Sequence, residues 1–254
     1  MRLEQVDRRI LGAVRFVDAT TDLPIASVLS VKANGLKFVR NLSGDYVIAG
    51  ARGLEDHATA FDKPPASPAL GALTFEISID DPAREYLSRR HTLKLPRDPN
   101  PENAGARDSL FRAVKVRLFP SSIAFTGVGW AVIRASVVRI GTNEPLNGAL
   151  LRVTKRNGNE ADEAKPLGVG LTDKRGEAMV AVPGIPITTF GEGAGAVTTN
   201  EIDVTITALF DPNAGAVPDP DDLEARRANL KKVAVNTKLR SGRVIPMKFE
   251  ITLS

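Results

Sequence analysis

The sequence contains no cysteine, and this absence excludes several kinds of site. Without thiols the chain has no disulfide framework, no cysteine-based zinc site and no thiol nucleophile. Secreted sandwich domains often carry a disulfide, so the absence favours assembly in a reducing cytosol. Residues 1–9 contain no apolar core segment, so we expect no signal peptide. No run approaches the roughly 18 apolar residues of a membrane span, so we expect no membrane partner.

Aromatic residues are scarce, at 5% of 254 residues, whereas 43% of the residues are apolar. The hydrophobic cores must therefore be built from Val, Ile, Leu and Ala. The 21 glycines and 17 prolines are typical of many short strands joined by turns. The length allows one large domain or two domains of ordinary size.

The chain also lacks a strong charge of one sign. It has 34 basic and 30 acidic residues, a net charge of +4, and both signs are mixed along its length. Nucleic-acid-binding surfaces gather basic residues on one face or stripe. The balanced charge therefore argues against a nucleic-acid partner.

No group of residues has the pattern of a catalytic or metal site. His57 and His91 each lack a second histidine nearby in sequence, and we expect His57 to lie in a solvated loop. No Gly-x-Ser-x-Gly sequence presents a nucleophile. The glycine-rich segment 191–195 lacks the following Lys and Ser or Thr of a phosphate loop, which favours a flexible loop. We expect a protein that is not an enzyme and has no cofactor, metal or small-molecule ligand.

Short strands are predicted along the first half of the chain. Asp81-Pro82 predicts a short helix over 83–87, with Asp at the N-cap and Pro at the first helical position. The clearest strand alternates apolar residues at positions 73, 75, 77 and 79. The predicted strands cover residues 10–17, 26–31, 36–39, 46–49, 73–80, 92–96 and 114–118.

The second half repeats landmarks of the first half in the same order. Pro145-Leu146 corresponds to Pro24-Ile25, and the strand at 201–209 corresponds to the strand at 73–79. Residues 219–232 predict the best helix, with acids at its start and bases at its end. The pattern indicates a divergent tandem duplication.

The strands follow one another without crossover helices, which indicates antiparallel sheets. The predicted fold is all-β, with two tandem Ig-like or prealbumin-like antiparallel β-sandwiches and short helical insertions. We expect a first sandwich at 1–98, a basic connector and bridging strand at 99–127, and a second sandwich at 128–254.

Residues 130–184 carry a recognisable pattern. An aliphatic strand leads to Pro145-Leu146, then to a Gly-Ala strand at 148–151, and then to Thr-Asp-x-x-Gly at 172–176 before another aliphatic strand. This order resembles the carboxypeptidase regulatory-like, or transthyretin-like, domain family. The resemblance implies a seven-stranded prealbumin-like sandwich. It also implies no catalysis, because members of that family are accessory, adhesive or structural modules.

Thr172, Asp173 and Gly176 are predicted to shape a loop. A short polar side chain can accept hydrogen bonds from backbone N–H groups within a tight turn, and glycine adopts a positive φ without strain. We expect a structural role for all three residues.

The function that these observations favour is a structural subunit of a large, cytoplasmically assembled particle, such as a phage tail or a contractile injection machine. Its partners would be other protein subunits, including copies of itself in a ring or particle. Sandwiches would act as spacers, and sheet edges and loops would dock. The candidate docking residues are the apolar positions of two alternating strands: Val114, Val116, Leu118, Met247, Phe249 and Ile251.

The alternative is a carbohydrate- or surface-binding accessory module. Sugar binding usually needs exposed aromatic rings for stacking. The chain has one tryptophan, Trp130, and two tyrosines, Tyr46 and Tyr86. Because Trp130 begins a core-like strand, a packing role is favoured, and this counts against the alternative.

Overall fold

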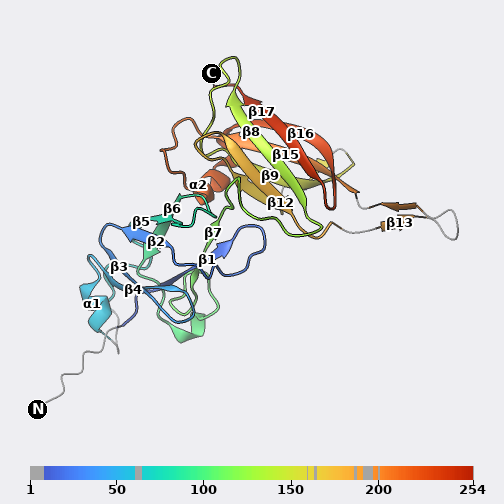
Figure 1. Ribbon diagram of the computed structural model, residues 1–254. Helices are drawn as coiled ribbons and strands as arrows, with labels where there is room; N and C mark the ends of the chain where they lie inside the picture. The colour runs from blue at the N-terminus through green and yellow to red at the C-terminus, as the bar shows by residue number, and fades with distance from the viewer. Residues whose placement is uncertain are drawn as a thin grey trace, which may run out of the picture. The chain divides into compact units, whose positions relative to one another are not determined.

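The computed structural model describes residues 9–60, 65–158, 160–162, 165–185, 188–190, 197–199 and 201–253. Over these residues the chain is mainly β-strand, with two short α-helices, so the predicted all-β class is confirmed (Figure 1). No described helix has both the length and the apolar character needed to cross a membrane.

The chain divides into two compact units that are not simple halves of the sequence. The first unit takes residues from 1–17, 23–82 and 88–117, and the second takes residues from 18–22, 83–87 and 118–254. The stretch 99–127, expected to be a connector, is therefore shared between the two units.

The first unit contains a four-stranded sheet in the order β3-β4-β1-β7 and a three-stranded sheet in the order β2-β5-β6. A 3-10 turn covers Pro101–Asn103. The elements are β1 (Ala13–Asp18), β2 (Ser30–Ala33), β3 (Leu36–Arg40), β4 (Tyr46–Ala51), α1 (Glu55–Thr59), β5 (Leu73–Asp80), β6 (Arg89–Leu95) and β7 (Val114–Leu118).

The second unit has the sheet order β10-β9-β15-β16, in which β11 also pairs with β9, and a separate sheet in the order β12-β8-β17. Strands β13 and β14 pair with each other as an antiparallel two-stranded sheet. The elements are β8 (Ala131–Arg139), β9 (Leu150–Asn157), β10 (Glu160–Ala161), β11 (Gly168–Leu171), β12 (Glu177–Val182), β13 (Thr188–Phe190), β14 (Val197–Thr199), β15 (Glu201–Phe210), α2 (Pro220–Ala225), β16 (Lys231–Arg240) and β17 (Val244–Ile251).

The same strand order occurs in both units. The neighbours β4-β1-β7 and β2-β5-β6 of the first unit correspond to β12-β8-β17 and β9-β15-β16 of the second unit. Local details repeat too. An isolated antiparallel β-bridge joins Val17 to Pro24 in the first repeat, and another joins Val138 to Pro145 in the second. In this correspondence β7 is the last strand of the first sandwich, as β17 is of the second.

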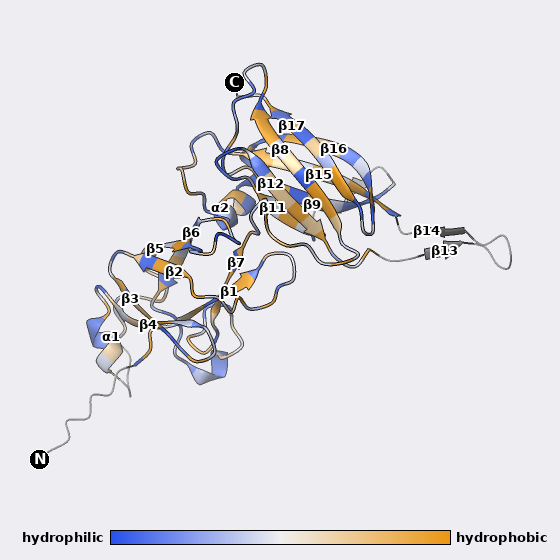
Figure 2. Cartoon of the chain, in the orientation of Figure 1, coloured by the Kyte–Doolittle hydropathy of each residue, from blue (hydrophilic) through white to orange (hydrophobic). Residues whose placement is uncertain are grey.

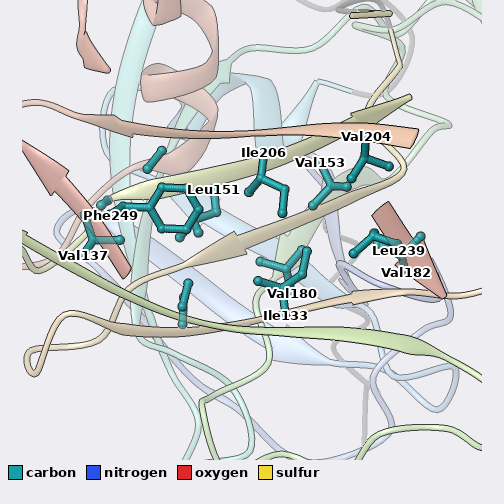
Figure 3. Close-up of a cluster of buried hydrophobic side chains, with 14 of the residues drawn as sticks. Ile133, Val137, Leu151, Val153, Val180, Val182, Val204, Ile206, Leu239 and Phe249 are labelled. Carbon is teal, nitrogen blue, oxygen red and sulfur yellow. The ribbon is translucent and has the colours of Figure 1, made fainter. Parts of the chain in front are cut away.

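The core of the second unit lies between its two sheets. Alternate residues of β8 and β12 point toward alternate residues of β9 and β15, and Figure 3 shows these side chains meeting in one layer. Figure 2 shows the apolar colouring concentrated along the same strands. The core includes Ile133, Val137, Leu151, Val153, Val180, Val182, Val204, Ile206, Leu239 and Phe249. Burial of each such side chain contributes roughly 1.5–3 kcal/mol, so this layer dominates the stability of the unit.

The first unit has a smaller core. Ile48 of β4 and Leu93 and Leu95 of β6 bury their side chains together, which joins the two sheets of that unit. The hydroxyl of Tyr46 accepts a hydrogen bond from Leu29 N (2.8 Å) and donates one to Leu29 O (2.9 Å). The buried tyrosine therefore holds the approach to β2 in place.

Two helix predictions differ from the structure. Residues 83–87 form no helix, since Arg84 has a φ of +60°, which a right-handed helix does not allow. The helix predicted at 219–232 ends as α2 at Ala225, and a 3-10 turn follows at Arg227–Asn229. Strand β16 begins at Lys231 because it pairs with β15 over ten residues, and that ladder outweighs local helix propensity.

The pairing of β17 differs from the antiparallel expectation. Strand β17 pairs with β8 in parallel, with Ile245 opposite Ile133 and Phe249 opposite Val137. The chain crosses from β16 in one sheet to β17 in the other through the turn at Ser241 and Gly242. This crossing makes β17 the last strand of its sheet.

Candidate docking edge and surface pocket

Thr172 lies at the turn between β11 and β12, with its side chain buried. Its hydroxyl donates to Leu146 O at 2.6 Å and accepts from Ala149 N at 2.8 Å. The backbone of Thr172 also bonds Ala149 O and Gly148 N. One residue therefore ties the β11–β12 turn to the segment that precedes β9.

Asp173 and Gly176 complete the same turn. Asp173 Oδ1 accepts hydrogen bonds from Arg175 N at 2.8 Å and Glu177 N at 3.1 Å. Gly176 has a φ of +72°, and a Cβ atom there would lie 2.5 Å from Val137 O. The three residues predicted to shape a loop are thus brought together at one turn.

The candidate docking residues are mostly inside the cores. Val116, Leu118, Phe249 and Ile251 are buried. Val114 and Met247 are partly buried and pack against the two cores. The alternation of apolar residues in these two strands therefore reflects packing within each sandwich. These side chains do not form a surface for a partner. What remains for docking is the backbone edge of the strands that carry them.

Both of those strands lie at the edge of a sheet. Strand β7 follows β1 at one end of its sheet, and β17 follows β8 at one end of the other. The outward side of β7 is occupied near its end, because the buried Arg89 donates from Nη1 to Arg117 O at 2.7 Å. The next carbonyl, Leu118 O, accepts a hydrogen bond from Ala19 N and so faces β1. Because successive residues of a strand point to opposite sides, Arg117 O faces away from β1.

The outward groups of β17 can be assigned from its hydrogen bonds. Arg243 O and Ile251 O accept from Val132 N and Ile140 N, so the odd-numbered residues face β8. The even-numbered residues then direct their N–H and C=O groups away from β8, since successive residues of a strand point to opposite sides. No described residue forms a backbone hydrogen bond with this outer side. It consists of Val244, Pro246, Lys248 and Glu250.

The opposite edge of the same sheet is covered. Strand β11 passes close to β12, and a Cβ atom at Gly168 would lie 2.8 Å from Ala181 O. A Cβ atom at Gly170 would lie 2.9 Å from Met179 O. Glycine at these two positions lets the backbones approach, so β12 is shielded while β17 is exposed.

A surface pocket of about 270 Å³ lies within the second unit. Trp130 contributes to its wall, together with Tyr86 and Phe125, although the sequence favoured a packing role for the tryptophan. Its other lining residues are Asp18, Thr20, Ala83, Arg84, Glu85, Pro120, Ile123, Ala124 and Met179. The pocket combines segments far apart in sequence, so no local pattern could have indicated it.

The two histidines lie in regular structure. His57 belongs to α1 and is buried, which differs from the solvated loop that the sequence favoured. His91 lies in β6 opposite Ile77. The glycine-rich segment 191–195 falls outside the residues that the structure describes.

No protein-family model matches the chain, and no curated protein sequence matches it. Several solved structures are similar at a low level. GBS52, the minor pilin of Streptococcus agalactiae, is 8% identical with a TM-score of 0.29, over 85% of this chain and 66% of that one. A variant of the shaft pilin SpaA of Lactobacillus rhamnosus GG is 12% identical with a TM-score of 0.28, over 97% and 98% of the two chains.

The TIE protein of Bacillus anthracis is 9% identical with a TM-score of 0.27. The match covers 96% of this chain, which spans 34% of the length of that protein. At these TM-scores the likeness gives no information about function.

Proposed function

We propose that this protein is a non-enzymatic structural subunit that docks to other protein subunits by adding their strands to the outer edge of β17. The observation that carries the proposal is the exposed edge of β17 in a sheet whose other edge is covered by β11. Main-chain hydrogen bonds of this kind give affinity in many strand-addition complexes. A phage tail or a contractile injection particle, assembled in the cytoplasm, is the setting that we propose.

The register of β17 suits it to this role. Phe249 and Ile251 anchor the strand in the core, and a one-residue slip would move both side chains out of it. The edge groups of Lys248 and Glu250 are therefore held at fixed positions. Pro246 lacks an N–H group, so an incoming strand gains its regular bonds on the C-terminal side of Pro246. Proline and charged residues on an edge strand also reduce non-specific strand pairing and aggregation. This edge therefore suits a specific partner.

The test replaces Glu250 by proline. Glu250→Pro removes one of the two outward N–H groups on the C-terminal side of Pro246, and we expect the protein to lose its association with assembled particles from producing cells. The matched control is Glu250→Ala, which removes the same 2.7 Å ion pair with Lys248 but keeps the N–H. Co-sedimentation with the particle is the measurement.

The melting temperature of each variant shows whether it is folded, which distinguishes a loss of docking from a loss of folding. Loss of co-sedimentation in the folded proline variant, with retention in the alanine variant, supports docking at the edge. If both variants bind as the parent chain does, the β17 edge is not the docking site. If the parent chain is found alone as a monomer and never with a particle, the structural role is wrong.

A further inference from the structure

The pocket beside Trp130 has features that core packing does not explain. The chain has only 13 aromatic residues (one Trp, two Tyr and ten Phe), and three of them line this pocket. By contrast, among the described residues Phe249 is the one aromatic residue fully buried in the main core of the same unit. Phe125 is 88% exposed, so its ring contributes almost nothing to folding.

The indole ring of Trp130 is held in position by its neighbours. A Cβ atom on Gly127 would lie 2.4 Å from Cε2 of Trp130, so only glycine permits the ring to lie this close to the backbone. Trp130 N also donates to Gly127 O. The ring is therefore fixed before any ligand arrives, which lowers the entropy cost of binding.

The polar groups of the pocket are also arranged in advance. Asp18 Oδ1 accepts from Thr20 N (2.8 Å) and Thr21 N (2.7 Å), and its Oδ2 accepts from the Tyr86 hydroxyl at 3.1 Å. This network fixes a carboxylate and a phenol on one wall. Glu85 adds a second carboxylate.

Arg84 supplies the cation of the pocket. It has a φ of +60°, in the left-handed region that residues with a side chain rarely adopt. Its guanidinium forms no hydrogen bond or ion pair with any other described residue, and the residue is exposed. Strained backbone that presents an unused donor group is a feature of ligand sites.

This set of groups selects among ligand classes. Two carboxylates against one guanidinium disfavour an anion such as a phosphate. The guanidinium beside the rings disfavours a quaternary ammonium ion. A neutral sugar fits, because its C–H face stacks on an aromatic ring while its hydroxyls donate to carboxylates and accept from arginine. The volume of about 270 Å³ is just below the roughly 300–1,000 Å³ of typical small-molecule sites, which suits a single sugar unit.

We propose that the pocket formed by Trp130, Tyr86, Phe125, Asp18, Glu85 and Arg84 binds a neutral sugar unit of a glycan chain. The site is separate from the β17 edge, so it would add recognition of a glycan surface to the proposed structural role. It stands whether or not the edge docks a partner, because no residue of the edge lines the pocket.

The experiment uses the single tryptophan as the probe. The full chain is titrated with neutral oligosaccharides of glucose, galactose, mannose and N-acetylglucosamine, and with one sulfated oligosaccharide. We expect a saturable change in Trp130 fluorescence with at least one neutral sugar and none with the sulfated sugar. Calorimetry then measures the affinity of the variants.

Two variants decide the result. Phe125→Ala and Arg84→Gly should each weaken binding about tenfold or more, whereas Arg84→Gly should leave the melting temperature equal or higher because glycine accepts a positive φ. Phe111→Ala is the matched control, since Phe111 is an exposed phenylalanine (58%) of the first unit. No response to any neutral sugar, equal affinity in all variants, or occupancy of the pocket by a protein partner would overturn the proposal.

Discussion

At the scale of single residues, glycines decide how closely two segments of the second unit approach. Gly176 has a positive φ, and its Cβ position lies against the backbone of Val137. Any side chain at this position would therefore meet both an unfavourable φ and a steric clash. Gly184 has nearly the same φ, +71°, but nothing lies within 4 Å of the Cβ position. Comparing substitutions at these two glycines therefore separates the effect of φ on stability from the effect of the close contact.

We expect Gly184→Ala to lower the free energy of unfolding by about 1–2 kcal/mol, the usual cost of a left-handed residue with a side chain. Gly176→Ala should cost clearly more, on the order of 3 kcal/mol or above, since the strand that holds Val137 must also shift. Urea denaturation followed by Trp130 fluorescence measures both, because the chain's one tryptophan lies in the second unit. Equal losses in the two variants would mean that the close contact is absent.

The turn at 172–176 shows which hydrogen bonds a sequence motif can predict. Thr-Asp-x-x-Gly indicated a turn because its hydrogen bonds are local, within residues 173–177. The hydroxyl of Thr172 bonds Leu146 and Ala149, which lie more than 20 positions away. Such partners depend on the register of strands and could not be read from the motif.

At the scale of elements, an arginine ties α2 to the end of β15. Arg226 donates to Asp222 Oδ2 at 2.9 Å within the same helical segment, and to Asp211 Oδ2 at 2.9 Å just after β15. These hydrogen bonds, first that of Asp222 and then that of Asp211, raise the pKa of Arg226. Asp211 is nearly buried, so it depends on this cation.

We expect Arg226→Ala to destabilise the second unit by about 1–3 kcal/mol, since it leaves a nearly buried carboxylate without its charged donor. Arg227→Ala is the matched control, because Arg227 pairs with Glu224 at 3.5 Å, does not reach Asp211, and has a similarly exposed side chain (43%, against 45% for Arg226). Amide hydrogen exchange of α2 is the measurement. Similar exchange rates in the two variants would show that Arg226 does not hold the helix.

Elements with a single strong pattern were predicted well. The strand at 73–80 matches β5 residue for residue, because its alternation faces one core and one solvated side. Strand β16 was not predicted, and the helix predicted at 219–232 covered its first two residues because charged residues after α2 extended an apparent helix. Segment 83–87 failed for the opposite reason, since a good cap sequence there is overridden by the positive φ of Arg84.

At the scale of the whole molecule, the second unit is built from three stretches of chain. Phe119, Leu150, Leu171, Leu209 and Leu223 form a second buried cluster in it. Ala19 and Leu87, from the two short early stretches, pack against this cluster. Leu87 N also donates to Phe119 O. The unit therefore needs residues from well before position 128.

We expect a fragment of residues 128–254 to be less stable than the same unit in the full chain by at least about 3 kcal/mol, because it lacks Phe119 as well as Ala19 and Leu87. A fragment of residues 118–254 restores Phe119 and should be intermediate. Urea denaturation followed by Trp130 fluorescence compares all three proteins. A fragment 128–254 as stable as the full chain would show that the boundary at 128 is sufficient.

The sequence by itself determined the all-β class and the doubling of the fold, since alternation and turn residues act over a few positions and recur in order. Only the tertiary structure decided which strands are edges, which apolar residues are core, and that Trp130 lines a pocket. Those properties depend on contacts between residues far apart in the chain. The apolar positions of β17 are the clearest case, because their pattern is the same whether the strand's neighbour is its own core or a partner.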